Sequence, residues 1–259
     1  MQYLEIIILG LLQGITEFLP ISSSGHLLIG RKIFGINEYG ILIEVFLHMG
    51  TLLSIIIYWY KDIKNEYQIF ISGNKNYFYC IIVGTIPAVI VGLLLNDFIK
   101  DNFFDISSMR YLPFNYLILS IIIFSSKYIK NNKIGNIFLQ SALIIGIAQS
   151  LAILPGLSRS GLTIIMGLYL GLNFKVATKY SFMLAIPILL FAAIDSIYDY
   201  FIIENFNQNI NLLLMIGFIA SFTSGYLMLV ILQKIIENRK LWYFSFYCLL
   251  ISMVLFYGI

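Results

Sequence analysis

Charged residues are scarce in this sequence. Asp, Glu, Lys and Arg together make up 11% of its 259 residues, while hydrophobic residues make up 60%. The mean hydropathy of +0.91 is far above that of a soluble domain of this length. The composition therefore excludes an ordinary soluble protein and predicts that a lipid bilayer surrounds most of the chain.

Cysteine is also scarce. Cys80 and Cys248 both lie in apolar stretches without metal-binding neighbours, which argues against a disulfide or a zinc site. The net charge of +3 is spread over loops and is not gathered with aromatic residues, so we expect no nucleic-acid partner. The first apolar run is preceded by Glu5 and by no Lys or Arg, unlike a secretory signal, and we expect it to stay in the mature protein.

Long apolar stretches make up most of the chain. Six of them have about the 20 residues that a helix needs to cross roughly 30 Å of hydrocarbon. We therefore expect an all-α polytopic membrane protein with six transmembrane helices. The six stretches are residues 41–60, 77–99, 111–129, 180–203, 210–236 and 241–259.

Two further apolar stretches, 3–34 and 137–172, are each broken near the centre by Pro, Gly and Ser. The breaks read EFLPISSSGH and AILPGLSRSG. Each half is too short to cross a bilayer comfortably, so the pattern favours two half-helices that meet at a turn inside the membrane, which is a re-entrant hairpin. One kinked spanning helix for each stretch is the alternative.

The two broken stretches repeat each other. Gln13 and Gln149 are equivalent at an offset of 136 residues, and the following serines keep the same offset. Three transmembrane stretches follow each hairpin, and a G-x-I-x5-G motif occurs after both, at 84–92 and at 217–225. The pattern indicates an internal duplication.

We expect a single membrane domain built from two repeats, residues 1–130 and 133–259. Each repeat contains one re-entrant helical hairpin and three transmembrane helices. Because three is an odd number of crossings, the second repeat must be inverted relative to the first. The two hairpins then enter from opposite sides, and their tips meet near the midplane of the membrane.

Basic residues orient the helices. The loops on one side contain Arg31, Lys32, Lys100 and Arg110, whereas those on the other side contain eleven Lys and Arg residues. The positive-inside rule makes the more basic side cytoplasmic, so the first hairpin enters from outside. The eleven are Lys61, Lys64, Lys75, Lys127, Lys130, Lys133, Lys175, Lys179, Lys234, Arg239 and Lys240.

The first hairpin concentrates polar groups at its tip. Gln13 and Glu17 are four residues apart and share one helical face. Three serines, 22–24, begin the next half-helix, where unpaired N–H groups and the helix dipole favour an anion. His26 follows within one turn of these serines. The tip therefore combines a carboxylate, hydroxyl groups and an imidazole.

The second hairpin has Ser158, Arg159 and Ser160 at the matching helix start, and Thr163 follows Arg159 at i+4. Arg159 is the only charged residue between 137 and 172. An arginine in the apolar middle of a helix costs roughly 2.5–3.5 kcal/mol on insertion scales, so it needs a partner. A purely structural pair of Glu17 with Arg159 is the alternative to a functional site.

Together the two tips favour phosphoryl chemistry on a membrane-embedded substrate. A guanidinium and N-terminal amides bind phosphate oxygens, while Glu and His supply metal ligation or proton transfer. We expect the cavity between the tips to open outward. Glu44 and His48 share one face of the first transmembrane stretch, where they either border the site or lie at the membrane interface.

At these residues the sequence resembles the bacterial undecaprenyl pyrophosphate phosphatases, also called bacitracin-resistance proteins. The first motif of that family matches QGITEFLPISSSGH at 13–26, and the second matches PGLSRSGLT at 155–163. Many members have a second acid where this chain has Gln13, so a metal site made of two carboxylates is in doubt.

The resemblance implies an enzyme of the bacterial plasma membrane that removes the terminal phosphate of undecaprenyl diphosphate, recycles the lipid carrier for peptidoglycan synthesis and confers bacitracin resistance. It implies a divalent cation, Mg²⁺ or Ca²⁺, at Glu17 with or without Gln13. It also implies catalytic roles for Glu17, Ser23, His26 and Arg159. Ser23 and His26 both remain open as the nucleophile, and so does a monomer or a homodimer. From their places at the two tips we expect substrate contacts from Gln13, Ser22, Ser24, Ser158, Ser160 and Thr163.

Two other classes have related features. Inverted repeats with broken helices also build transporters, so a transporter or lipid flippase with a midplane anion site is the alternative function. The acid phosphatase superfamily that acts on phosphatidic acid uses Ser-Gly-His and Ser-Arg-x5-His. Its second histidine should stand at residue 165, where this chain has Ile165, which excludes that superfamily.

Overall fold

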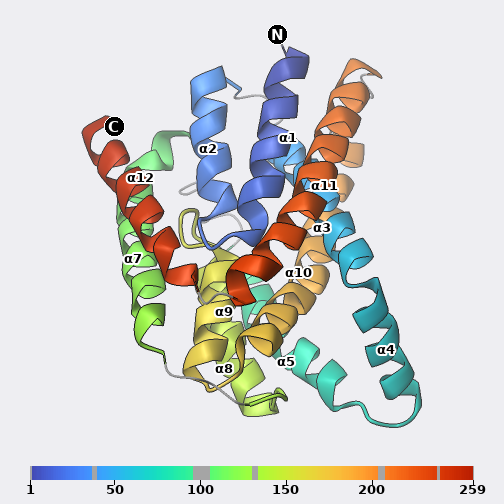
Figure 1. Ribbon diagram of the computed structural model, residues 1–259. Coiled ribbons are helices and arrows are strands. Elements are labelled where there is room, and N and C mark those ends of the chain that lie inside the picture. The colour runs from blue at the N-terminus through green and yellow to red at the C-terminus, as the bar shows by residue number, and fades with distance from the viewer. Residues whose placement is uncertain are drawn as a thin grey trace.

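The computed structural model describes residues 2–36, 40–95, 106–129, 134–203, 208–237 and 240–258. These residues form helices and, apart from one isolated bridge between Ile134 and Leu172, no strand pairing (Figure 1). In chain order the helices are α1 (Gln2–Phe18), α2 (Ser23–Phe34), α3 (Gly40–Tyr58), α4 (Tyr60–Ile71), α5 (Asn76–Leu94), η1 (Ile106–Tyr111), α7 (Leu112–Ser125), η2 (Ser126–Tyr128), α8 (Leu139–Leu151), α9 (Arg159–Tyr169), α10 (Phe174–Ile203), α11 (Gln208–Glu237), η3 (Leu241–Tyr243) and α12 (Phe244–Gly258).

The predicted transmembrane helices are confirmed by length and composition. Five segments in the described part of the chain are long and apolar enough to cross a membrane, and α3 with α4 makes a sixth if this bent pair is one span. The expected span 41–60 differs in one respect, because the chain turns by 69° after Tyr58 and continues as α4. Lys61, Asp62 and Lys64 explain the turn, since charged side chains are costly inside the bilayer.

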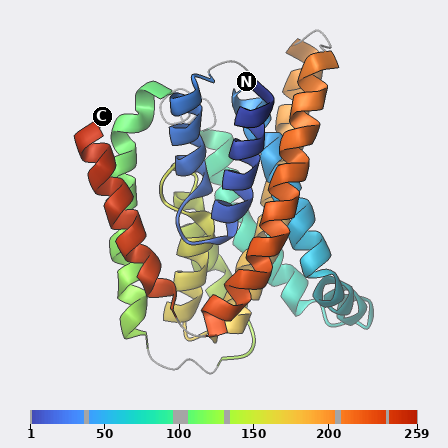
Figure 2. The same ribbon diagram turned by 45° about the horizontal axis from the view of Figure 1, so that its top comes forward.

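The two broken stretches fold as the predicted hairpins. α1 and α2 meet at a turn inside the molecule, and α8 and α9 meet at a turn after entering from the opposite end (Figure 2). The four helices have 17, 12, 13 and 11 residues, fewer than the roughly 20 that a crossing needs. Each stretch therefore contains two half-helices, and the alternative of one kinked spanning helix is wrong.

Each hairpin packs against a helix from the other half of the chain. α1 packs on α11, and α8 packs on α5, the equivalent helix of the first half. A Cβ on Gly10 would lie 2.7 Å from the carbonyl oxygen of Gly217, and one on Gly146 would lie 2.5 Å from that of Gly84. The repeated glycines therefore permit the same close contact twice. The boundary predicted at 130–133 lies outside the described residues and stays a prediction.

Two helical segments that are rich in lysine lie at one end of the bundle. α4 and the start of α10 are at the end opposite the chain termini marked N and C (Figure 1). Lys179 of α10 joins these two elements, with Nζ 3.0 Å from a carboxylate oxygen of Asp62 and 2.9 Å from one of Glu66. This ion-pair network holds α4 against the bundle at the end that the sequence predicts to be cytoplasmic.

Candidate active site

Both hairpin tips use the same backbone geometry. Ser22 and Ser158 precede α2 and α9, have φ angles of 65° and 52°, and are the non-glycine residues with positive φ in the described part of the chain. Each caps its helix, because its Oγ accepts a hydrogen bond from the N–H of Gly25 or of Gly161. Positive φ strains a serine backbone, and such strain is typical of functional sites.

Hydrogen bonds between the tips hold them together. The N–H of Gly156 donates to Oγ of Ser22 at 2.9 Å, and Oγ of Ser160 donates to the carbonyl oxygen of Leu19 at 3.1 Å. The N-termini of α2 and α9 therefore face the same place. Because the first N–H groups of a helix have no partner within it, this place favours an anion.

Glu17 lies at the centre of the contact between the two hairpins. Its Oε1 is 2.5 Å from Nη2 of Arg159. Its Oε2 accepts hydrogen bonds from Oγ of Ser23 at 2.6 Å and from Nε2 of Gln13 at 3.1 Å. Arg159 thus has the buried partner that its place in the membrane requires, and the same carboxylate orients the Ser23 hydroxyl.

His48 of α3 completes this cluster. Its Nε2 lies 3.6 Å from Oε2 of Glu17, and its Nδ1 lies 2.7 Å from the carbonyl oxygen of Glu44. A carbonyl oxygen only accepts, so Nδ1 donates, and Nε2 is the ring nitrogen that faces Glu17. The Glu44 carboxylate is itself fixed by Nη1 of Arg31 at 2.8 Å, which ties the start of α3 to α2.

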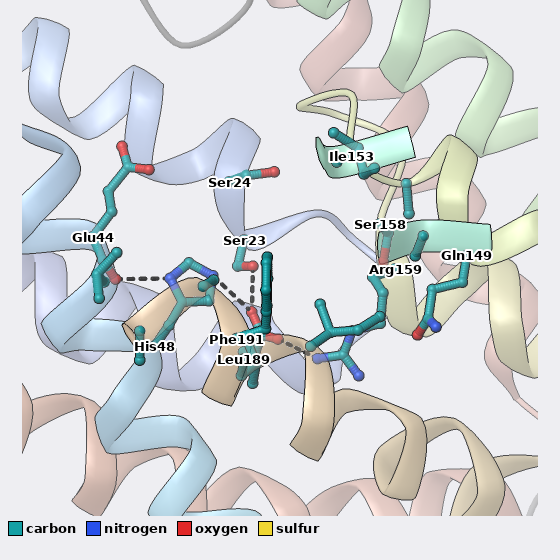
Figure 3. Close-up of a pocket in the computed structure, with 18 of the residues that line it drawn as sticks. Ser23, Ser24, Glu44, His48, Gln149, Ile153, Ser158, Arg159, Leu189 and Phe191 are labelled. Atoms are coloured by element: carbon teal, nitrogen blue, oxygen red, sulfur yellow. Dashed lines mark hydrogen bonds and ion pairs between the residues drawn. The ribbon is translucent and has the colours of Figure 1, made fainter. Parts of the chain in front are cut away.

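These groups face one cavity of about 350 Å³, a volume typical of small-molecule sites. Ser23, His48 and Arg159 point toward a common centre (Figure 3). Residues of α3, α5 and α10 form an apolar wall beside the polar one, so the cavity suits a ligand with a charged head and an apolar chain. Its polar lining consists of Glu17, Ser22, Ser23, Ser24, Glu44, His48, Gln149, Ser158 and Arg159.

Three of the predicted substrate-binding residues do not line the cavity. Gln13 is completely buried behind Glu17, to which it donates. The hydroxyl of Ser160 joins the tips, because it donates to the carbonyl oxygen of Leu19. Oγ1 of Thr163 lies 2.6 Å from Oγ of Ser181 and also donates to the carbonyl oxygen of Arg159. In this geometry the three support the residues that face the cavity.

His26 also lies outside the cavity, which corrects the expectation that its imidazole converges with the other groups. Its Nδ1 is 2.7 Å from the carbonyl oxygen of Ser22 and 2.9 Å from Oη of Tyr116, and its Nε2 is 2.7 Å from Oη of Tyr247. These partners on α7 and α12 hold the ring away from Glu17. The imidazole that lies beside the carboxylate belongs to His48, while a catalytic role for His26 stays a prediction.

Gln149 is a further cavity residue that was not predicted. It is 2% exposed, its Nε2 donates to the carbonyl oxygen of Gly84 at 3.3 Å, and its Oε1 has no partner in the described part of the chain. Buried acceptors without a partner are unusual. The repeat offset was the available signal, because Gln149 is equivalent to Gln13 of the first hairpin.

The fold defines a polytopic membrane protein, and its candidate anion site lies where two inverted re-entrant hairpins meet. The sequence profile of the family described as Bacitracin resistance protein BacA matches residues 6–254. The undecaprenyl-diphosphatase of Thermosipho africanus is 40% identical over 97% of this chain and 98% of its own length. Proteins of the same name from Halothermothrix orenii and Methanosphaera stadtmanae are 35% and 38% identical over nearly the whole of both chains. The chain belongs to the BacA bacitracin-resistance family, as its two motifs predict.

Proposed function

We propose that this protein hydrolyses undecaprenyl diphosphate to undecaprenyl phosphate and orthophosphate. The observation that carries the proposal is the contact of Glu17 with both Ser23 and Arg159 where two helix N-termini open into one cavity. A guanidinium and backbone N–H groups bind phosphate oxygens, and the carboxylate orients a hydroxyl toward them. The names of the relatives support the same activity. Its product is the lipid carrier used in peptidoglycan synthesis, and abundant enzyme confers bacitracin resistance.

In the proposed first step, Oγ of Ser23 attacks the terminal phosphorus. Ser23 is favoured over His26 as the nucleophile because its hydroxyl faces the cavity and donates to Glu17 at 2.6 Å. The bond from this phosphorus to the bridging oxygen breaks, and the lipid phosphate leaves as an anion that needs no proton. The serine proton passes to Glu17, and Arg159 stabilises the charge on the phosphoryl oxygens.

In the second step, water attacks the phosphorus of the phosphoserine and the bond to Oγ breaks. Ser23 regains its proton from Glu17, and orthophosphate leaves. Nε2 of His48 faces this carboxylate and is placed to accept the proton of the water. The net reaction consumes one water for each diphosphate cleaved.

The divalent cation, Mg²⁺ or Ca²⁺, stays a prediction. Arg159, Ser23 and Gln13 together engage both oxygens of Glu17, and no three His, Cys, Asp or Glu side chains of the described residues are placed to hold a metal ion together. The chain therefore suits a cation that is held mainly by the diphosphate, with at most the one carboxylate beside it. Mg²⁺ commonly binds this way, and when bound it neutralises phosphate charge.

We further propose that the cavity opens on the outer face of the bacterial plasma membrane. The distribution of basic residues supports this orientation, because α4 and the start of α10 carry Lys61, Lys64, Lys175 and Lys179 at the end opposite the first hairpin's entry. The lipid tail can stay in the bilayer while the charged diphosphate enters a polar cavity, which avoids burying that charge in hydrocarbon.

The test is release of orthophosphate and undecaprenyl phosphate by the purified protein in detergent, where no gradient exists. We expect equal amounts of both products from the wild type. We expect none from Arg159→Ala, a variant whose folding is checked by thermal melting. A transporter or flippase binds the lipid without cleaving it, so binding without product from a folded wild type would overturn the proposal.

A further inference from the structure

Gly92 is the one glycine of the repeated G-x-I-x5-G motif that helix packing does not explain. A Cβ on Gly84, Gly217 or Gly225 would lie 2.5, 2.8 or 3.0 Å from a neighbouring helix. Apart from its chain neighbours and the backbone of its own helix, no atom of the described residues lies within 4 Å of the position that a Cβ on Gly92 would occupy. Because glycine weakens a helix, a glycine that faces open space requires another reason.

The open space beside Gly92 belongs to the cavity, since Gly92 is one of its lining residues. α5 and α10 touch near the start of α5, where Oη of Tyr180 donates to the carbonyl oxygen of Cys80 at 2.6 Å. Further along, Phe191 of α10 lines the cavity and is also 43% exposed. One side chain of α10 thus borders both the cavity and the surface of the bundle, and Gly92 lines the same cavity from α5.

The wall at this opening is apolar. Val89 of α5 and Leu189 of α10 line it together with Gly92 and Phe191, and the polar lining lies on the hairpin tips and α3 (Figure 3). A cavity of about 350 Å³ is at the small end of ligand sites and is too small to contain a polyprenyl chain. The polyprenyl chain must therefore leave the cavity, and an apolar exit keeps this chain out of water.

We propose that the polyprenyl tail of the substrate leaves the cavity between α5 and α10, across Gly92. The missing side chain at this position makes room for the isoprene units where the tail leaves the cavity. The equivalent Gly225 has no such opening, because a Cβ there would lie 3.1 Å from the ring of Phe18. The inference rests on the proposed function for the identity of the lipid.

Chain-length kinetics test this exit. Gly92→Phe places a large side chain in the opening, and Gly92→Ala, which adds one methyl group, is the smaller substitution for comparison. We expect Gly92→Phe to lower kcat/KM for undecaprenyl diphosphate by about tenfold or more, and to leave isopentenyl diphosphate, which has one isoprene unit, within about twofold. Gly92→Ala should give a smaller loss than Gly92→Phe with undecaprenyl diphosphate. Equal losses with both substrates would contradict the proposal.

A second experiment requires only binding. Gly92→Cys is treated in detergent with a thiol reagent, alone or with undecaprenyl phosphate or inorganic phosphate. Wild type gives the background, since Cys80 and Cys248 are buried. We expect protection by undecaprenyl phosphate and not by inorganic phosphate. Protection by both would mean that the phosphate group binds at Gly92, protection by neither would mean that the tail lies elsewhere, and either result overturns the proposal. Phosphate release by the same wild-type preparation tests the proposed function separately.

Discussion

Nη2 of Arg159, on the second hairpin, lies 2.5 Å from Oε1 of Glu17, on the first. The two side chains are 15% and 5% exposed, so each charge depends on the other for compensation. This contact joins the two halves of the chain where both tips turn. It also sets a guanidinium, a group suited to phosphate oxygens, beside the carboxylate that accepts the hydrogen bond of Ser23.

Removal of one charge from this pair tests both of its roles. Glu17→Gln leaves Arg159 uncompensated, which costs about 3–5 kcal/mol, and removes the acceptor of the Ser23 proton. We expect a lower melting temperature and no phosphate release. The double variant Glu17→Gln/Arg159→Gln should regain melting temperature and stay inactive. An active Glu17→Gln protein would contradict the proposed proton transfer.

The cation prediction has a binding test. If the cation arrives with the diphosphate, calorimetric titration of Ca²⁺ into the substrate-free protein should show no saturable binding, while turnover should stop in excess chelator. Added Mg²⁺ should not restore Glu17→Gln, because an amide does not supply carboxylate charge. Saturable Ca²⁺ binding that Glu17→Gln abolishes would instead establish a resident site.

The two histidines should respond differently to substitution. His48 faces Glu17, so His48→Ala should lower kcat by about 10²–10⁴-fold with little change in melting temperature. His26 holds the start of α2 through Ser22, Tyr116 and Tyr247, so His26→Ala should lower activity and melting temperature together. An inactive His26→Ala protein with wild-type melting would restore a direct catalytic role for His26.

The orientation of the cavity can be measured in intact cells. Ser24 lines the cavity on the first hairpin, and both native cysteines are buried. We expect Ser24→Cys to react with a membrane-impermeant thiol reagent added outside, and we expect substrate to protect it. Reaction only from the cytoplasmic side would reverse the predicted topology.

Much of the fold could be predicted because local composition decides which segments cross a membrane. Apolar length predicts the spans, and the Pro, Gly and Ser breaks predict the hairpins. The repeated Gly10 and Gly146 mark the contact that each hairpin makes with the other half. The bend after Tyr58 was missed, because the apolar stretch continues to Tyr60, beyond the turn.

The part of the candidate site that lies on the two hairpin tips could be predicted from the sequence. Glu17, Ser23 and Arg159 meet because the inverted repeat brings both tips to one place. The approach of His48 to Glu17 depends instead on how α3 packs beside α1, which spacing along the chain does not encode. The tyrosines that hold His26 outside the cavity come from α7 and α12, far away in sequence.

The most direct test of the account is phosphate release by the Arg159→Lys protein, once its melting temperature is shown to equal that of the wild type. A lysine keeps the charge for Glu17 but is a point charge and does not hold two phosphate oxygens in a planar fork. We predict a folded protein with at least about a hundredfold lower kcat/KM. Arg110→Lys, at an exposed arginine, is the matched control and should be fully active. An Arg159→Lys protein with most of the wild-type activity would contradict a phosphate-gripping role and leave the pair with Glu17 purely structural.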